Sequence, residues 1–238
     1  MTSPKRLVVA IDGPAGSGKS TAARRLAQRL GYALLDTGAI YRALALVARE
    51  RGVSWDDEAA LAAIAAGLEV RFELEGDLNR VFLGVGAARR EVTVAIRTPE
   101  MNEGASKVSR HPAVRAALLD LQRRLAAKGG IVAEGRDLGS VVFPHAEAKF
   151  FLLASPEVRA RRRFDELRAA GHEVALEEVL RDQVDRDRRD STRATAPLRK
   201  AEDAQEIDSS ALGPDEVVAL MEAVVRRRAG ANAIDKPE

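Results

Sequence analysis

Cysteine is absent from this 238-residue sequence, which excludes disulfides, thiolate metal sites and a cysteine nucleophile. Aromatic residues make up only 4%, which argues against the stacking platforms that bind single-stranded nucleic acid. No apolar run is long enough to span a membrane, and no apolar region typical of a signal peptide precedes the first strand-like segment. We therefore expect a cytoplasmic protein without a membrane or nucleic-acid partner.

Lysine is also scarce: only seven of the 38 basic residues are Lys, and the rest are Arg. The isoelectric point of about 9.1 suggests an anionic partner, whereas the net charge is only +2. A general preference for Arg explains most surface arginines, so only clustered ones indicate function. The three histidines show neither metal-ligand spacing nor a nucleophile partner.

One stretch fits the phosphate-binding pattern G-x-x-x-x-G-K-[ST] at every fixed position: Gly13, Pro14, Ala15, Gly16, Ser17, Gly18, Lys19, Ser20. It lies between an apolar run and a helix-like segment, the strand–loop–helix context that this pattern requires. Glycines let successive backbone N–H groups face a phosphate, and the helix adds the positive end of its dipole. We expect residues 13 to 21, ending with Thr21, to bind phosphate groups, with Lys19 at the β/γ-phosphates and Ser20 on Mg²⁺.

Strand-like and helix-like segments alternate along most of the chain, which predicts an α/β fold with a parallel sheet flanked by helices. The expected strands are 7–11, 32–35, 131–133, 149–154 and 205–207. The segment 68–83 instead alternates apolar and polar residues with period two, and 85–94 continues it. These segments predict an antiparallel β lobe inserted at about residues 63–100 of a single domain, 1–238.

Polar and charged residues gather where the predicted strands end, the edge at which such sheets bind ligands. Thr37, Tyr41 and Arg42 follow the second strand, and Arg136 and Asp137 follow the third. Tyr41 as a half-buried core aromatic and Arg42 as a surface charge remain open alternatives. Arginines also crowd two helices after Pro156, either as a lid over anions or as solvated helices with salt bridges.

These segments together resemble the bacterial cytidylate kinases, which are P-loop nucleoside monophosphate kinases. The resemblance is carried by residues 12–20, 35–42, 134–139 and 186–198, and it runs from about Leu7 to Arg227. It implies transfer of a phosphoryl group from ATP, with Mg²⁺, to CMP or dCMP by a monomer. It also implies a nucleoside monophosphate (NMP) binding region at 38–115, which contains the insert, and a short helical lid at 156–193.

The resemblance further implies roles for individual residues. Arg42, Arg136 and Arg193 would hold the CMP phosphate; Tyr41, Arg186 and Asp190 would surround the sugar; Ser106, Arg115 and Asp137 would read cytosine. Thr37 joins the substrate-binding set, Arg162 and Arg163 would cover the ATP phosphates, and Lys19, Arg136, Arg162 and Arg186 form the catalytic set. The chain departs from the family at Glu134, where the family often has Asp.

Two other functions compete with this hypothesis. A kinase for another acceptor would share the phosphate loop, and the inserted lobe together with Ser106, Arg115 and Asp137 argues against it. A non-catalytic or nucleic-acid-binding P-loop protein would fit the basic isoelectric point, and the shortage of aromatic residues argues against it.

Overall fold

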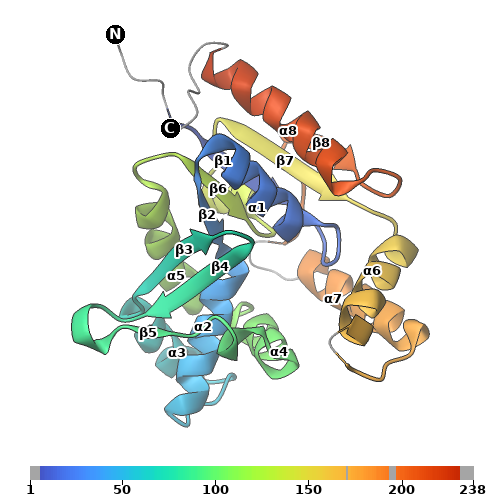
Figure 1. Ribbon diagram of the computed structural model, residues 1–238. Coiled ribbons are helices and arrows are strands. Elements are labelled where there is room, and N and C mark those ends of the chain that lie inside the picture. Colours follow the sequence, from blue (N-terminus) through green and yellow to red (C-terminus); the bar gives the residue numbers. More distant parts are fainter. Residues whose placement is uncertain (1–5, 170, 193–196, 231–238) are drawn as a thin grey trace.

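The structure, a computed structural model, describes residues 6–169, 171–192 and 197–230. A five-stranded parallel sheet with the order β2-β6-β1-β7-β8 forms its centre (Figure 1). The strands are β1 (Val8–Asp12), β2 (Ala33–Asp36), β6 (Ile131–Glu134), β7 (Ala148–Leu153) and β8 (Gln205–Asp208). All five strands expected from the sequence are therefore present, and the predicted parallel α/β fold is confirmed.

Each face of the sheet is covered by helices, because residues along a strand alternate between its two faces. Val9 and Ile11 of β1 join the apolar cluster under α1 (Lys19–Leu30) and α8 (Pro214–Ala229). Ala10 between them joins the cluster under α2 (Thr37–Glu50), α3 (Glu58–Ala66), α4 (Pro99–Val108) and α5 (Pro112–Ala126). The continuous apolar run of β1 thus reflects burial on both faces.

The inserted antiparallel sheet is also confirmed, with β3 (Val70–Glu75), β4 (Leu78–Leu83) and β5 (Arg90–Glu91). The expectation that 85–94 continues the strands is wrong for most of that segment. Gly84 and Gly86 have positive φ angles, which turn the chain into the 3₁₀ turn η1 (Gly86–Ala88), and a second one, η2 (Ala95–Arg97), follows. Within 85–94, Arg90 and Glu91 form the strand pairing with β4, and Val92 N adds one hydrogen bond to Val81 O over 2.8 Å.

The insert and a helical hairpin stand on two sides of the phosphate loop (Figure 1). The hairpin consists of α6 (Pro156–Ala169) and α7 (Leu176–Thr192). On the other side, the tip of the β3–β4 turn rests on α1, where Gln28 Nε2 donates to Gly76 O over 2.6 Å. Among the described helices, none is both long and apolar enough to cross a membrane.

Candidate active site

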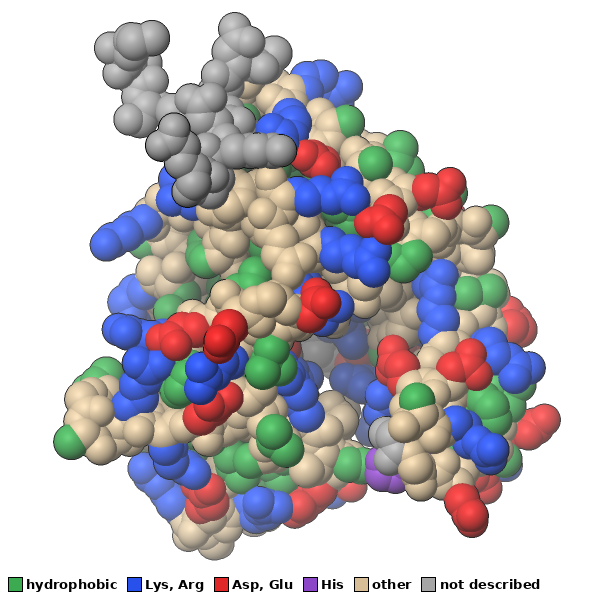
Figure 2. Space-filling view, in the orientation of Figure 1, with side chains coloured by type: hydrophobic (Ala, Val, Ile, Leu, Met, Phe, Trp, Pro, Cys, Tyr) green, Lys and Arg blue, Asp and Glu red, His purple; other side chains and the backbone are tan. Residues whose placement is uncertain are grey.

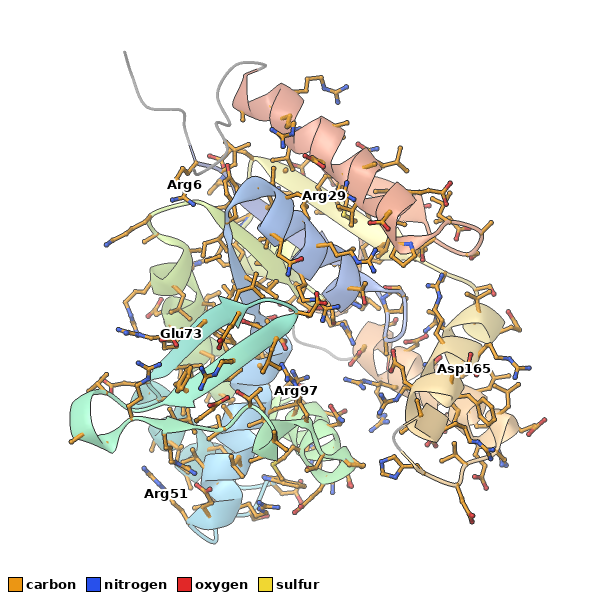
Figure 3. The ribbon with its side chains drawn as sticks, viewed as in Figure 1. Arg6, Arg29, Arg51, Glu73, Arg97 and Asp165 are labelled. Atoms are coloured by element: carbon orange, nitrogen blue, oxygen red, sulfur yellow. The ribbon has the colours of Figure 1, made fainter. Side chains whose placement is uncertain are left out.

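A cavity of about 1040 Å³ opens at the carboxyl ends of β1, β2 and β6. Figure 2 shows it as a hollow between the insert and the α6–α7 hairpin, with Lys and Arg side chains inside. In Figure 3, Asp165 on α6 marks the hairpin side of the cavity, and Arg97 marks the position of the insert. The cavity therefore lies where a parallel sheet is expected to bind a ligand.

Most residues predicted from the sequence line this one cavity. The lining includes Ala15, Gly16, Ser17, Gly18, Lys19, Ser20, Thr21, Thr37, Tyr41, Arg42, Ser106, Arg115, Arg136, Asp137, Arg162, Arg163, Arg186 and Asp190. Gly13 and Pro14 are not among the lining residues, and Arg193 lies outside the described residues. Residues from seven separate segments of the sequence thus meet in one place.

The conformation of the phosphate loop depends on its glycines. A Cβ atom at Gly13 would lie 2.1 Å from the carbonyl oxygen of Leu152 on β7, so only glycine fits there. Gly18 has a φ of 88° and caps the N-terminus of α1. The loop therefore presents the start of this helix to the cavity, as an anion-binding site requires.

Lys19 is buried at the base of the cavity, and its ammonium donates to Pro14 O over 2.6 Å. Burial lowers the pKa of Lys19 well below its usual value, and the nearby charges of Arg136 and Arg186 lower it further. Burial likewise lowers the pKa of Arg186 to about 10, with Arg136 adding to the shift. A phosphate chain would compensate these three crowded cations.

Ser20 donates its hydroxyl hydrogen to Glu134 Oε2 over 2.8 Å. Burial raises the pKa of Glu134, and the charge of Asp36 raises it further. Within the described residues, no group of three or more His, Asp or Glu side chains could hold a metal ion. A serine hydroxyl beside a carboxylate nevertheless suits Mg²⁺, which prefers oxygen ligands and keeps water and substrate phosphates as its other ligands.

On the opposite wall, Arg115 of α5 donates to Asp137, and both side chains are less than one-tenth exposed. The Arg115 guanidinium also lies 5.7 Å from the centre of the Tyr41 ring. Ser106 of α4 lines the same region. The wall therefore offers a guanidinium, a carboxylate and a hydroxyl, a set that can recognise the polar edge of a base.

Between this wall and the phosphate loop lie two arginines, one on α2 and one after β6. Arg42 on α2 forms an ion pair with Asp36 over 2.7 Å, and Asp36 also caps α2 by accepting from Ala39 N. Arg136, after β6, forms an ion pair with Asp190 of α7 over 3.1 Å. These ion pairs hold the guanidiniums beside the cavity.

The α6–α7 hairpin contacts the phosphate loop directly. Arg159 is buried, donates to Ala15 O over 2.9 Å and pairs with Asp187 over 2.7 Å. Arg162 donates to both the hydroxyl and the carbonyl oxygen of Ser209, whose hydroxyl lies 3.1 Å from Ser17 O. These two arginines of α6 are therefore held by carboxylate, carbonyl and hydroxyl groups.

Sequence reasoning missed several residues that shape the site, namely Asp12, Asp36, Arg159, Gln183 and Ser209. Asp36 carried a usable signal, since an Asp directly before a helix is a typical N-cap. Gln183 and Ser209 are single polar residues in ordinary segments, and only their buried contacts with Arg159 O and Ser17 O reveal them.

A sequence profile described as "Cytidylate kinase" matches residues 9–227. A cytidylate kinase from Geobacter sp. (strain M21) is 50% identical over 222 residues, covering 93% of this chain and 94% of the relative. A cytidylate kinase from Vibrio cholerae is 51% identical over 211 residues, covering 89% and 92%. Among solved structures, a gluconokinase from Sinorhizobium meliloti 1021 aligns over 96% of this chain and 95% of its own, at 18% identity and a TM-score of 0.46. The match over nearly the whole chain shows that this protein belongs to the cytidylate kinase family.

Proposed function

We propose that this protein transfers the γ-phosphoryl group of ATP to CMP or dCMP and releases ADP with CDP or dCDP. Family membership supports the reaction. The observation that carries the choice of acceptor is the buried pair of Arg115 and Asp137 in the cavity wall. A polar pair in this position can bind one base edge and reject another.

Cytosine presents an amino donor at N4 and acceptors at N3 and O2. The carboxylate of Asp137 accepts from N4, and the guanidinium of Arg115 donates to N3 or O2. Uracil reverses the polarity of two of these positions, so that an acceptor meets an acceptor and a donor meets a donor. Rejection follows because the buried groups of the protein would be left unpaired.

The CMP phosphate binds Arg42, Arg136 and Arg193, and the sugar binds Tyr41, Arg186 and Asp190. The ion pairs of Arg42 with Asp36 and of Arg136 with Asp190 orient these guanidiniums before substrate arrives. Orientation of this kind lowers the entropic cost of bringing the two nucleotides into line. Thr37, whose hydroxyl donates to Glu134 O over 2.7 Å, fixes the loop between the acceptor and donor sites.

On the donor side, residues 13–21 wrap the ATP phosphates, and Lys19 leaves Pro14 O to donate to the β- and γ-phosphates. Arg162, Arg163 and Arg186 add positive charge where negative charge develops in the transition state. Mg²⁺ neutralises phosphate charge when bound. Ser20 would be its ligand, and Glu134 would orient that hydroxyl or a water beside it.

We further propose that two regions of the chain have separate roles in binding the nucleotides. Residues 38–115 form the NMP-binding region, and residues 156–193 form a lid that closes over both nucleotides and excludes water. We also propose that the protein acts as a monomer. Light scattering of the purified protein, which measures its molar mass in solution, tests this oligomeric state. A cytoplasmic location suits an enzyme that consumes ATP.

A coupled assay of ADP formation tests the function with CMP, dCMP, UMP, AMP and GMP as separate acceptors. We expect turnover with CMP and dCMP and little with the other three. A preference for a purine nucleotide would favour a kinase for another acceptor. Salt-sensitive RNA binding without turnover of CMP would favour a non-catalytic P-loop protein.

A further inference from the structure

Asp12, the last residue of β1, joins the phosphate loop to the turn that carries the base-reading wall. Its side chain is 3% exposed. One carboxylate oxygen accepts from Leu138 N over 2.9 Å, and the other accepts from Gly139 N over 2.8 Å. Asp12 is followed directly by Gly13, and Leu138 directly follows Asp137. One side chain therefore spans the two halves of the active site.

The turn held by Asp12 has an unusual backbone. Residues Leu138–Val142 form a π turn, in which Phe143 N donates to Leu138 O over 2.7 Å. Such turns are rare and occur frequently at functional sites. Because the first N–H groups of a helical turn lack partners within the turn, the Asp12 carboxylate supplies the acceptors that Leu138 and Gly139 need.

The space around the Asp12 contact leaves little room for adjustment. A Cβ atom at Gly139 would lie 3.2 Å from Lys149 Cδ, 3.4 Å from Ala201 Cβ and 3.5 Å from Asp12 Oδ2. Lys149 is itself fixed, since its ammonium donates to Pro144 O over 2.6 Å and pairs with Asp203. Because the side chains around Gly139 are closely packed and fixed, the 138–142 turn cannot shift without displacing them.

Burial raises the pKa of Asp12 to about 6, while the hydrogen bonds from Gly139 and Leu138 lower it in part. Two charged groups act on Asp12 from neighbouring elements: Asp137 raises its pKa further, and Lys19 lowers it. Lys149, packed on the same turn, directs its charge to Asp203. Above about pH 6 the carboxylate accepts at both oxygens, and below it a proton occupies one of them.

We propose that Asp12 is a positioning residue for base recognition, which fixes the 137–139 turn against the phosphate loop and so sets the place of the Arg115–Asp137 pair. The inference rests on the proposed function, because selectivity for cytosine is the property that Asp12 controls. Asp12 is not among the residues that line the cavity. Its hydrogen bonds go to the 137–139 turn, so its effect falls mainly on the choice of base, and its charge acts only weakly on Lys19 of the donor site.

The test is Asp12→Asn, measured as kcat/KM for CMP and for UMP with ATP as donor. The amide keeps one acceptor but turns its NH₂ group toward an N–H donor, so the turn shifts at Gly139 or Leu138. A displacement near 1 Å lowers kcat/KM for CMP by about 10²-fold. We expect the CMP/UMP ratio to fall by about 10-fold or more, a size typical when a residue that orients a binding group is changed, while KM for ATP changes by a smaller factor.

Two further variants make the test specific. Ser140→Ala removes a hydroxyl that donates to Asp137 O over 3.4 Å in the same turn without touching Asp12, and it should keep the wild-type ratio. Gly139→Ala pushes the turn from the opposite side and should lower the ratio partially. If Asp12→Asn does not fold, as judged by circular dichroism, the CMP/UMP ratio of the Gly139→Ala variant tests the proposal instead.

The wild-type enzyme supplies an independent measurement. Because CMP and UMP carry the same phosphate and sugar, ionisations that act on those groups cancel in the ratio. The CMP/UMP ratio should therefore fall as pH drops below about 6, and in Asp12→Asn it should not change across the same range.

A wild-type ratio that is constant between about pH 5 and pH 8 would overturn the inference. So would a folded Asp12→Asn or Gly139→Ala variant with the wild-type ratio. Absence of CMP turnover in the wild-type protein would instead overturn the proposed function, so the two failures are distinguishable.

Discussion

Replacing Asp137 with Asn removes the negative charge from the Arg115–Asp137 pair while keeping the shape of the side chain. The carboxylate accepts from Arg115 in a place where both side chains are less than one-tenth exposed. In Asp137→Asn the amide can still accept from cytosine N4, but it can also turn and donate to uracil O4. The variant should therefore accept UMP far better than the wild-type protein does, relative to CMP.

The size of this effect follows from the burial of the pair. A hydrogen bond to a charged group contributes about 1.5–3 kcal/mol, and each 1.36 kcal/mol is tenfold in rate. Loss of that contribution for CMP alone predicts a decrease of about 10- to 150-fold in the CMP/UMP ratio of kcat/KM. Arg115 also loses its buried counter-charge, so the free energy of unfolding should fall by about 1–3 kcal/mol.

The assay measures kcat/KM for both acceptors at saturating ATP, with chemical denaturation of the same preparations. Asp120→Asn is the matched control, since Asp120 is exposed on the same helix as Arg115 and should change neither quantity. Equal slowing of CMP and UMP in Asp137→Asn would refute base reading. In that case Asp137 would act on phosphate or metal binding instead.

Three further predictions concern the donor side and the lid. Lys19→Ala should fold, as judged by circular dichroism, but lose about 10²- to 10³-fold in kcat, because one preorganised donor to the transferring phosphoryl group is gone; near wild-type turnover would contradict its role. Glu134→Gln should raise the Mg²⁺ concentration needed for half-maximal rate by about 10-fold, since the bond from Ser20 weakens; an unchanged Mg²⁺ titration would exclude that role. A bisubstrate analogue should slow hydrogen exchange at 156–169 and 171–192, where anions pair with crowded guanidiniums, and equal exchange with and without it would argue against a lid.

The strands of both sheets could be predicted because the pattern of apolar and polar residues within each strand is a local signal. Residues 7–11 are apolar throughout, as a strand buried on both faces requires, and residues 68–74 alternate, as a strand with one wet face requires. The segment 85–94 was mispredicted because glycines at 84 and 86 interrupt the alternation with positive φ angles. A period-two pattern alone does not show where pairing stops.

The candidate site was predictable only where residue type and spacing specify a contact. The phosphate loop has such a pattern, and its neighbours Thr37, Tyr41 and Arg42 follow from the rule that ligands bind at the ends of parallel strands. The contacts of Asp12 with Leu138 and of Arg159 with Ala15 join residues 126 and 144 positions apart. Nothing local marks such contacts, because tertiary packing creates them.

The most direct test of the account is internal competition, with CMP and UMP at equal concentration in one reaction with ATP and Mg²⁺. The initial ratio of CDP to UDP formed equals the ratio of the two kcat/KM values, so differences in protein preparation or active fraction cancel. The wild-type protein should form CDP in large excess, by about 10²-fold or more for a site that reads a buried polar edge. Formation of CDP and UDP in similar amounts would contradict the claim that Arg115 and Asp137 select cytosine.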